Sequence, residues 1–89
     1  MAYKIIETSL ALQDLDNILG YIAVSLASPK AASDFADRVE KCYSNLERTP
    51  LMYELCRDPH LRLMGYRKAV LKHYIMIYKI EEGSKTVAV

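Results

Sequence analysis

Apolar residues in the first third of the chain recur every three or four positions, which is the spacing of one face of an α-helix. Residues 3–7 before this stretch are rich in β-branched residues and predict a short strand. Thr8 or Ser9 can cap the helix that follows. The apolar stripe of that helix consists of Leu12, Leu15, Ile18, Leu19, Ile22 and Leu26.

A second helix is predicted to begin at Ser28-Pro29, because serine can cap a helix and proline fits its first position. Arg48-Thr49-Pro50 ends it. About two residues join the two helices, so they should run antiparallel as a helical hairpin. The apolar stripe of this second helix consists of Ala32, Phe35, Val39, Cys42 and Leu46.

The second half of the chain changes from helical to strand spacing. Residues 50–65 have no clean period and predict an irregular connection with a helical turn around Leu51–Cys56. Residues 66–71 read as a strand. The near-continuous apolar run over 74–80 is typical of a central strand covered on both faces. Residues 85–89 begin one more strand after a turn.

These elements predict a single α+β domain over residues 1–89. We expect an antiparallel sheet of about four strands, in the order β-α-α-β-β-β, with the helical hairpin packed on one face. The last strand stops almost as soon as it begins. Either this strand is naturally short or residues that should follow it are absent, and we expect a domain that is truncated at its C-terminal strand.

Composition excludes several classes of protein. Hydrophobic residues make up 52% of the 89 residues, too many for a disordered chain. The N-terminus is not a signal peptide, and no apolar run approaches the roughly 20 residues of a membrane span, so a cytoplasmic protein is expected. Cys42 and Cys56 lack the spacing of a zinc site, and neither a metal nor a cofactor is predicted.

The net charge of +1 hides an uneven distribution. Residues 1–53 carry five basic and seven acidic side chains, whereas residues 54–80 carry six basic and two acidic ones. A basic half of this kind is expected where a surface meets a polyanion. Chance clustering on a solvated face explains it equally well, so both interpretations stay open.

Five segments stand out by their order and spacing: Leu15–Ile22, Ser28–Ala32, Leu46–Pro50, Gly65–Val70 and Tyr74–Ile80. Together they resemble the RelE/ParE superfamily of type II toxins. This resemblance implies a growth-inhibiting toxin, of a class associated with plasmid stabilisation, that a cognate antitoxin wraps and neutralises. RelE-like members cut mRNA on the ribosome, whereas ParE-like members bind DNA gyrase and are not nucleases. The chain could also form a homodimer.

Family members usually continue with a further strand that carries a basic residue, and this chain departs from the family at that point. The alternative function is therefore an inactive scaffold that retains only antitoxin binding. In either case, we expect the antitoxin to lie across the helical hairpin and the sheet edge.

Metal-independent RNA cleavage would need a base, an acid and fixed cations. Arg67 is the candidate cation, because its planar guanidinium matches phosphate oxygens, and His73 is the candidate for proton transfer. Arg67 and Lys68 point to opposite faces if both lie on one strand, so one of them can be merely solvent-facing. Further phosphate contacts are predicted for Lys68, Lys72, Arg62 and Arg57.

The gyrase-binding alternative needs no acid or base, only an exposed and shaped surface. Sequence patterns do not decide between mRNA and gyrase as the target. If Arg67 belongs to the active surface, we expect Arg67→Ala to weaken toxicity without unfolding the domain.

Overall fold

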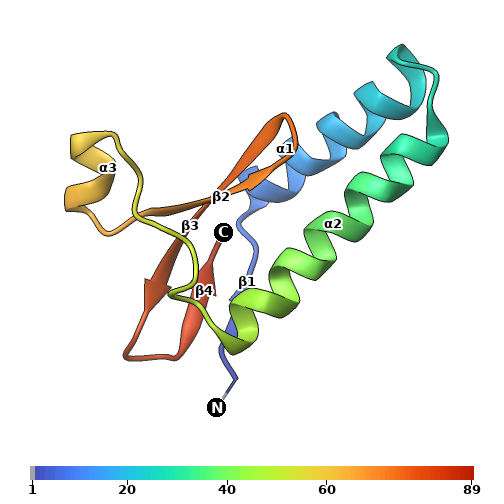
Figure 1. The fold of residues 1–89 in the computed structure, drawn as a ribbon. Helices are drawn as coiled ribbons and strands as arrows, with labels where there is room; N and C mark the ends of the chain where they lie inside the picture. The colour runs from blue at the N-terminus through green and yellow to red at the C-terminus, as the bar shows by residue number, and fades with distance from the viewer. Residues whose placement is uncertain (1) are drawn as a thin grey trace.

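The computed structural model describes residues 2–89 and has an α+β fold (Figure 1). The two long helices form the predicted hairpin, and α2 runs along one side of the sheet. No helix in the described part of the chain is long and apolar enough to cross a membrane. In chain order the elements are β1 (Lys4–Ile6), α1 (Ser9–Gly20), the π-helical turn η1 (Tyr21–Ser25), α2 (Pro29–Arg48), α3 (Pro59–Leu63), β2 (Arg67–Leu71), β3 (Tyr74–Glu81) and β4 (Thr86–Ala88).

The four strands form one sheet in the order β1-β4-β3-β2. The β2–β3 and β3–β4 pairs are antiparallel, as predicted, but β1 pairs with β4 in parallel. The sheet is therefore mixed, and the prediction of a wholly antiparallel sheet is wrong in this respect. The helical hairpin, α3, β2 and β3 all lie between these two strands in the chain, and hydropathy alone does not reveal the direction of such distant pairing.

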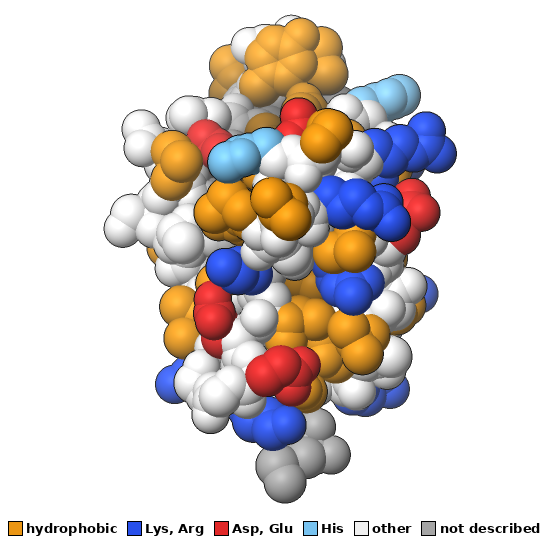
Figure 2. Space-filling view, turned by 90° about the vertical axis from the view of Figure 1, so that its left-hand side faces the viewer, with side chains coloured by type: hydrophobic (Ala, Val, Ile, Leu, Met, Phe, Trp, Pro, Cys, Tyr) orange, Lys and Arg blue, Asp and Glu red, His pale blue; other side chains and the backbone are white. Residues whose placement is uncertain are grey.

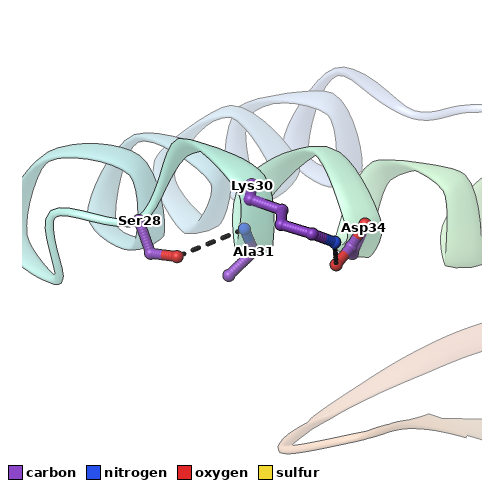
Figure 3. Close-up of polar contacts among 4 residues, drawn as sticks. All are labelled: Ser28, Lys30, Ala31 and Asp34. Carbon is purple, nitrogen blue, oxygen red and sulfur yellow. Dashed lines mark hydrogen bonds and ion pairs between the residues drawn. The ribbon is translucent and has the colours of Figure 1, made fainter.

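Local capping sets the starts of both long helices. The Thr8 hydroxyl accepts a hydrogen bond from the Ala11 N–H at 3.1 Å, and the Ser28 hydroxyl accepts one from the Ala31 N–H at 3.3 Å. Figure 3 shows the second cap together with the exposed Lys30–Asp34 ion pair at 3.1 Å. An exposed pair of this kind stabilises a helix by only a few tenths of a kcal/mol. The caps therefore do more than the ion pair to fix where the helices begin.

The connection between α2 and β2 contains a short helix, but not where the sequence predicted one. Residues 51–56 form turns and an isolated bridge, so the predicted helical turn there is wrong. Instead α3 begins at Pro59, because an Asp58 carboxylate oxygen accepts hydrogen bonds from the N–H groups of His60 and Leu61 at 3.0 and 3.1 Å. Aspartate followed by proline is a favourable helix start.

The core lies between α2 and one face of the sheet. Every apolar residue predicted on the stripe of α2 is buried, and Leu46, Tyr78 and Val87 are the largest fully buried side chains. The first helix contributes much less, since α1 has no buried side chain. The sheet contributes Ala69, Leu71, Met76, Tyr78 and Val87 to this core.

The other face of the sheet is exposed. Val70, Ile75 and Ile77 point away from α2 and keep 64, 58 and 42% of their surface exposed. The prediction that the apolar strand over 74–80 is covered on both faces is therefore wrong. Only its alternate residues can reach α2, because successive side chains of a strand point to opposite faces.

Tyr78 ties the sheet to the connection that follows α2. Its hydroxyl donates a hydrogen bond to the Pro50 carbonyl at 2.8 Å, and its ring packs edge-on to Tyr53 with centroids 6.3 Å apart. Burial raises the pKa of Tyr78 to about 12, although the nearby Arg67 acts in the opposite direction. The side chain therefore stays protonated, and able to donate, throughout the neutral range.

We expect the domain to lose stability between about pH 10 and 12. An unfolded tyrosine ionises near pH 10, whereas folded Tyr78 holds its proton to about pH 12, so rising pH favours the unfolded state in this window. Urea unfolding at a series of pH values measures the effect. Tyr78→Phe should have a shallower loss, and the exposed Tyr21→Phe should behave like the parent protein. Parallel curves for all three proteins would contradict the assignment.

Candidate functional site

Arg67, the candidate cation, is held by the fold. It is the first residue of β2 and pairs with Tyr78 across the sheet. Its Nη1 donates a hydrogen bond to the Tyr53 carbonyl at 2.7 Å, and the side chain is partly buried. Alternation with the buried Ala69 and Leu71 places Arg67 on the side of the sheet that faces the core. Its guanidinium is thus already engaged by the connection after α2.

Lys68 lies on the opposite face from Arg67. It shares that face with the exposed Val70, and its backbone N–H donates to the Glu54 carbonyl at 3.1 Å. The two adjacent basic residues of β2 therefore serve different surfaces, as the alternation rule predicts for any strand.

Arg57 and Arg62 are exposed on the segment that leads into β2. Arg62 lies on α3 and Arg57 just before it, while the Leu55–Arg67 bridge joins this segment to the start of the strand. Four of the six predicted site residues therefore lie toward the same end of β2, namely Arg57, Arg62, Arg67 and Lys68.

Lys72 and His73 form the turn at the other end of β2. Both side chains are exposed, and Lys72 adopts a φ of 59°, which is unusual for a residue other than glycine. The turn borders a groove of about 430 Å³ between the strands and the helical hairpin, which Tyr21, Asp34 and Tyr74 also line.

The structure therefore does not bring Arg67 and His73 together. β2 spans five residues, and at about 3.3 Å per residue its two ends lie about 13 Å apart. A general acid or base must come within about 3 Å of the atom it serves. A cation at one end and an imidazole beyond the other do not form a single catalytic centre.

The other titratable groups of the core are poorly suited to proton transfer. Burial raises the pKa of the Cys42 thiol, which keeps it protonated. The pKa of Tyr43 is raised by burial and by the Glu7 carboxylate, to which its hydroxyl donates at 2.9 Å. Within residues 2–89, no three His, Cys, Asp or Glu side chains are grouped so that they could hold a metal ion.

The exposed side of β2 and β3 is the feature that sequence reasoning missed. We call it the outer sheet face. Figure 2 shows the side of the molecule away from α2, where apolar side chains are interspersed with lysine and arginine side chains. Alternation along the two strands within residues 68–79 would have assigned these side chains to one face. It would not have shown that this face is exposed. The outer sheet face consists of Lys68, Val70, Ile75, Ile77 and Lys79.

One contact orders this face locally. The Lys79 ammonium lies 5.7 Å from the centre of the Tyr66 ring, a cation–π distance. Tyr66 directly precedes β2, so the contact joins β3 to the segment that carries α3. The outer sheet face therefore offers apolar contact area beside cations, one of which is held against an aromatic ring.

A family model described as the ParE toxin of the type II toxin–antitoxin system, parDE, matches residues 5–89. No curated protein matches the chain. The family match confirms the RelE/ParE resemblance, and a type II system implies a cognate antitoxin as partner. The chain therefore belongs to the ParE family of toxins of type II toxin–antitoxin systems.

Proposed function

We propose that this toxin arrests growth by binding DNA gyrase and not by cutting mRNA. The observation that carries the proposal is the separation of Arg67 from His73 by the length of β2, with the Arg67 guanidinium bonded to the Tyr53 carbonyl. Binding a protein target requires no convergent acid and base. The ParE family match supports the same choice, because ParE-like toxins were the gyrase-binding class in the resemblance described above.

The outer sheet face is the surface we assign to the target. Val70, Ile75 and Ile77 give it contiguous exposed apolar area, which marks interaction sites in small soluble domains. Lys68 and Lys79 beside them add cations, which suit a target that works on DNA. An apolar centre with a charged rim is typical of protein interfaces.

We propose that the cognate antitoxin covers the helical hairpin and the neighbouring sheet edge. Several large apolar side chains of the hairpin are exposed. They lie on its amphipathic helices or in the turn between them, and they are Leu10, Leu12, Tyr21, Val24 and Leu26. An amphipathic helix of a partner can lay its apolar face on such a surface. Association of two copies of the chain, named above as a further possibility, is separate from this placement and is tested by sedimentation.

The target is tested by two assays on the purified chain. We expect inhibition of gyrase-catalysed DNA supercoiling and no cleavage of a reporter mRNA in a translating extract. The His73→Ala variant should inhibit gyrase as strongly as the parent protein, because His73 lies outside the surface that we assign to gyrase. Ribosome-dependent cleavage that His73→Ala abolishes would contradict the proposal. Soluble, folded protein that neither inhibits gyrase nor arrests growth would favour an inert scaffold.

An acidic side chain introduced on the outer sheet face should weaken the toxin. We expect Val70→Asp to reduce gyrase inhibition about tenfold or more. At an apolar contact the new carboxylate would lose its hydrating water without gaining a hydrogen-bond or ionic partner. The side chain is exposed, so thermal unfolding should change little. Leu63→Asp on α3 is the matched control, since Leu63 is 87% exposed and lies outside this face. Equal loss in both variants would remove the face from the binding surface.

Arg67→Ala should act through stability. The substitution leaves the Tyr53 carbonyl without its donor, and we expect the free energy of unfolding to fall by about 1–3 kcal/mol. The sequence alone led us to expect weaker toxicity without unfolding of the domain, and to this we now add a loss of stability. Lys68→Ala, on the other face, is the control for lost charge alone. Any loss of growth arrest by Arg67→Ala should match its loss of folded protein, measured by urea unfolding. Complete loss at unchanged stability would make Arg67 part of the active surface.

A further inference from the structure

The outer sheet face divides into an apolar part and a cationic part. Val70 pairs with Ile75 next to the turn that follows β2, so exposed apolar side chains occupy that part of the face. Lys68 and Lys79 lie toward the other end, where β2 begins. Ile77 pairs with Lys68 and lies at the boundary. One part of the face therefore suits an apolar contact, and the other suits an anion.

The cationic part continues onto the segment before β2. α3 lies near the start of β2, on the side of the sheet away from α2 (Figure 1). Arg62 on α3 and Arg57 just before it are both exposed. The bridge between Leu55 and Arg67 holds this segment beside the strand. We call this cationic region the basic end of the outer sheet face. It consists of Arg57, Arg62, Lys68 and Lys79.

Carboxylates do little to neutralise the basic end. Glu54 and Asp58 are the two acidic residues between positions 54 and 80. An Asp58 carboxylate oxygen accepts the N–H groups that begin α3, and Glu54 bonds to Lys68 through its backbone carbonyl. Within residues 2–89, the ion pairs closer than 4 Å involve Lys30 and Lys85, neither of which belongs to the basic end. Its cations are therefore free to meet an anionic partner.

The two lysines of the basic end are spaced to contact separate phosphates. Lys68 pairs with Ile77 and Lys79 follows two positions later, so the lysines are diagonal neighbours, about 7–8 Å apart. Phosphates on one DNA strand follow one another at about 3.4 Å along the helix axis. Lys79 is also held in place, since its ammonium lies 5.7 Å from the centre of the Tyr66 ring. Glu81, two positions beyond Lys79 on β3, marks the limit of the basic end.

We propose that the basic end contacts the phosphate backbone of duplex DNA held by gyrase, while the apolar part of the outer sheet face contacts gyrase itself. The inference rests on the proposed function and adds DNA to the surface that the toxin recognises. A group of cations without interleaved carboxylates matches a row of phosphates, whose negative charge is also unbroken. Carboxylates of gyrase are the other anions that suit these cations, but only phosphate contact makes the affinity depend on DNA.

Contact with phosphates has a measurable signature. Each phosphate that a lysine or arginine neutralises releases condensed counterions, so affinity falls as salt rises. The slope of log affinity against log salt is about −0.9 per contact, and four contacts give a slope between about −3 and −4. Phosphate contacts carry no base-sequence information directly, so we expect duplexes of different sequence to bind alike.

Binding of the purified chain to a short duplex of mixed sequence tests the contact without gyrase. We expect weak binding by fluorescence anisotropy at low salt, with a salt slope between about −3 and −4. Lys68→Gln and Lys79→Gln should each make the slope shallower by about 0.9. Lys41→Gln is the matched control, because Lys41 is exposed on α2, on the other side of the sheet. Lys79→Arg should keep the parent slope, since it keeps the charge.

A second measurement compares gyrase alone with gyrase that carries a linear duplex. We expect the toxin to bind the gyrase–DNA complex about tenfold or more tightly than gyrase alone at low salt. The double variant Lys68→Gln/Lys79→Gln should lose much of this difference and should bind DNA-free gyrase as the parent protein does. Val70→Asp should weaken binding to both forms of gyrase, because it alters the apolar part of the face.

The outcomes separate this inference from the proposed function. Equal affinity for the two forms of gyrase, or a duplex salt slope that neither lysine variant changes, would overturn the phosphate contact and leave gyrase binding intact. Weaker binding of the double variant to DNA-free gyrase would assign the lysines to gyrase carboxylates and would also overturn it. Duplex binding that needs both lysines, without binding to gyrase in either form, would support the phosphate contact and refute the proposed function.

Discussion

The apolar stripe of α2 can cover only one face of the sheet, and much of the molecule follows from this constraint. Leu46 is fully buried with Tyr78 and Val87 in a single layer between helix and strands. A chain of this size buries only about 60% of its unfolded surface, so the second face has no covering layer of its own. Val70 and Ile77 are exposed for this reason. The apolar residues left outside the core become surfaces for partners.

The same constraint separates what the sequence predicts from what it does not. Helix starts depend on residues three positions apart, and Thr8 and Ser28 indicated both caps correctly. The same logic applied to Asp58-Pro59 would have located α3. Sequence patterns instead predicted a helical turn earlier in the chain, around Leu51–Cys56. Burial of a strand face depends on elements far away in the sequence. A run such as residues 74–80 looks the same whether one of its faces is covered or both are.

The sequence could suggest residues for a candidate site, but it could not show how they are arranged. Arg67 and His73 are six positions apart, which looks close in sequence, yet an extended strand separates such residues much more than a helix does. The partner of Arg67 is the carbonyl of Tyr53, which comes from an irregular connection with no periodic signal. The parallel pairing of β1 with β4 was missed for a similar reason, because the two strands are far apart in the sequence and no local pattern sets the direction of their pairing.

These arrangements bear directly on how one scaffold can serve different activities. The Arg67 guanidinium donates one of its N–H groups to the Tyr53 carbonyl, so the connection after α2 fixes where this cation lies, away from His73 at the other end of β2. A binding surface that contains Val70 and Ile77 needs no meeting of a cation with an acid or base, because these side chains are already exposed on one face of the sheet. A partner that covered them would gain the apolar burial that the chain cannot achieve alone. The packing that holds Arg67 apart from His73 therefore also favours function through binding.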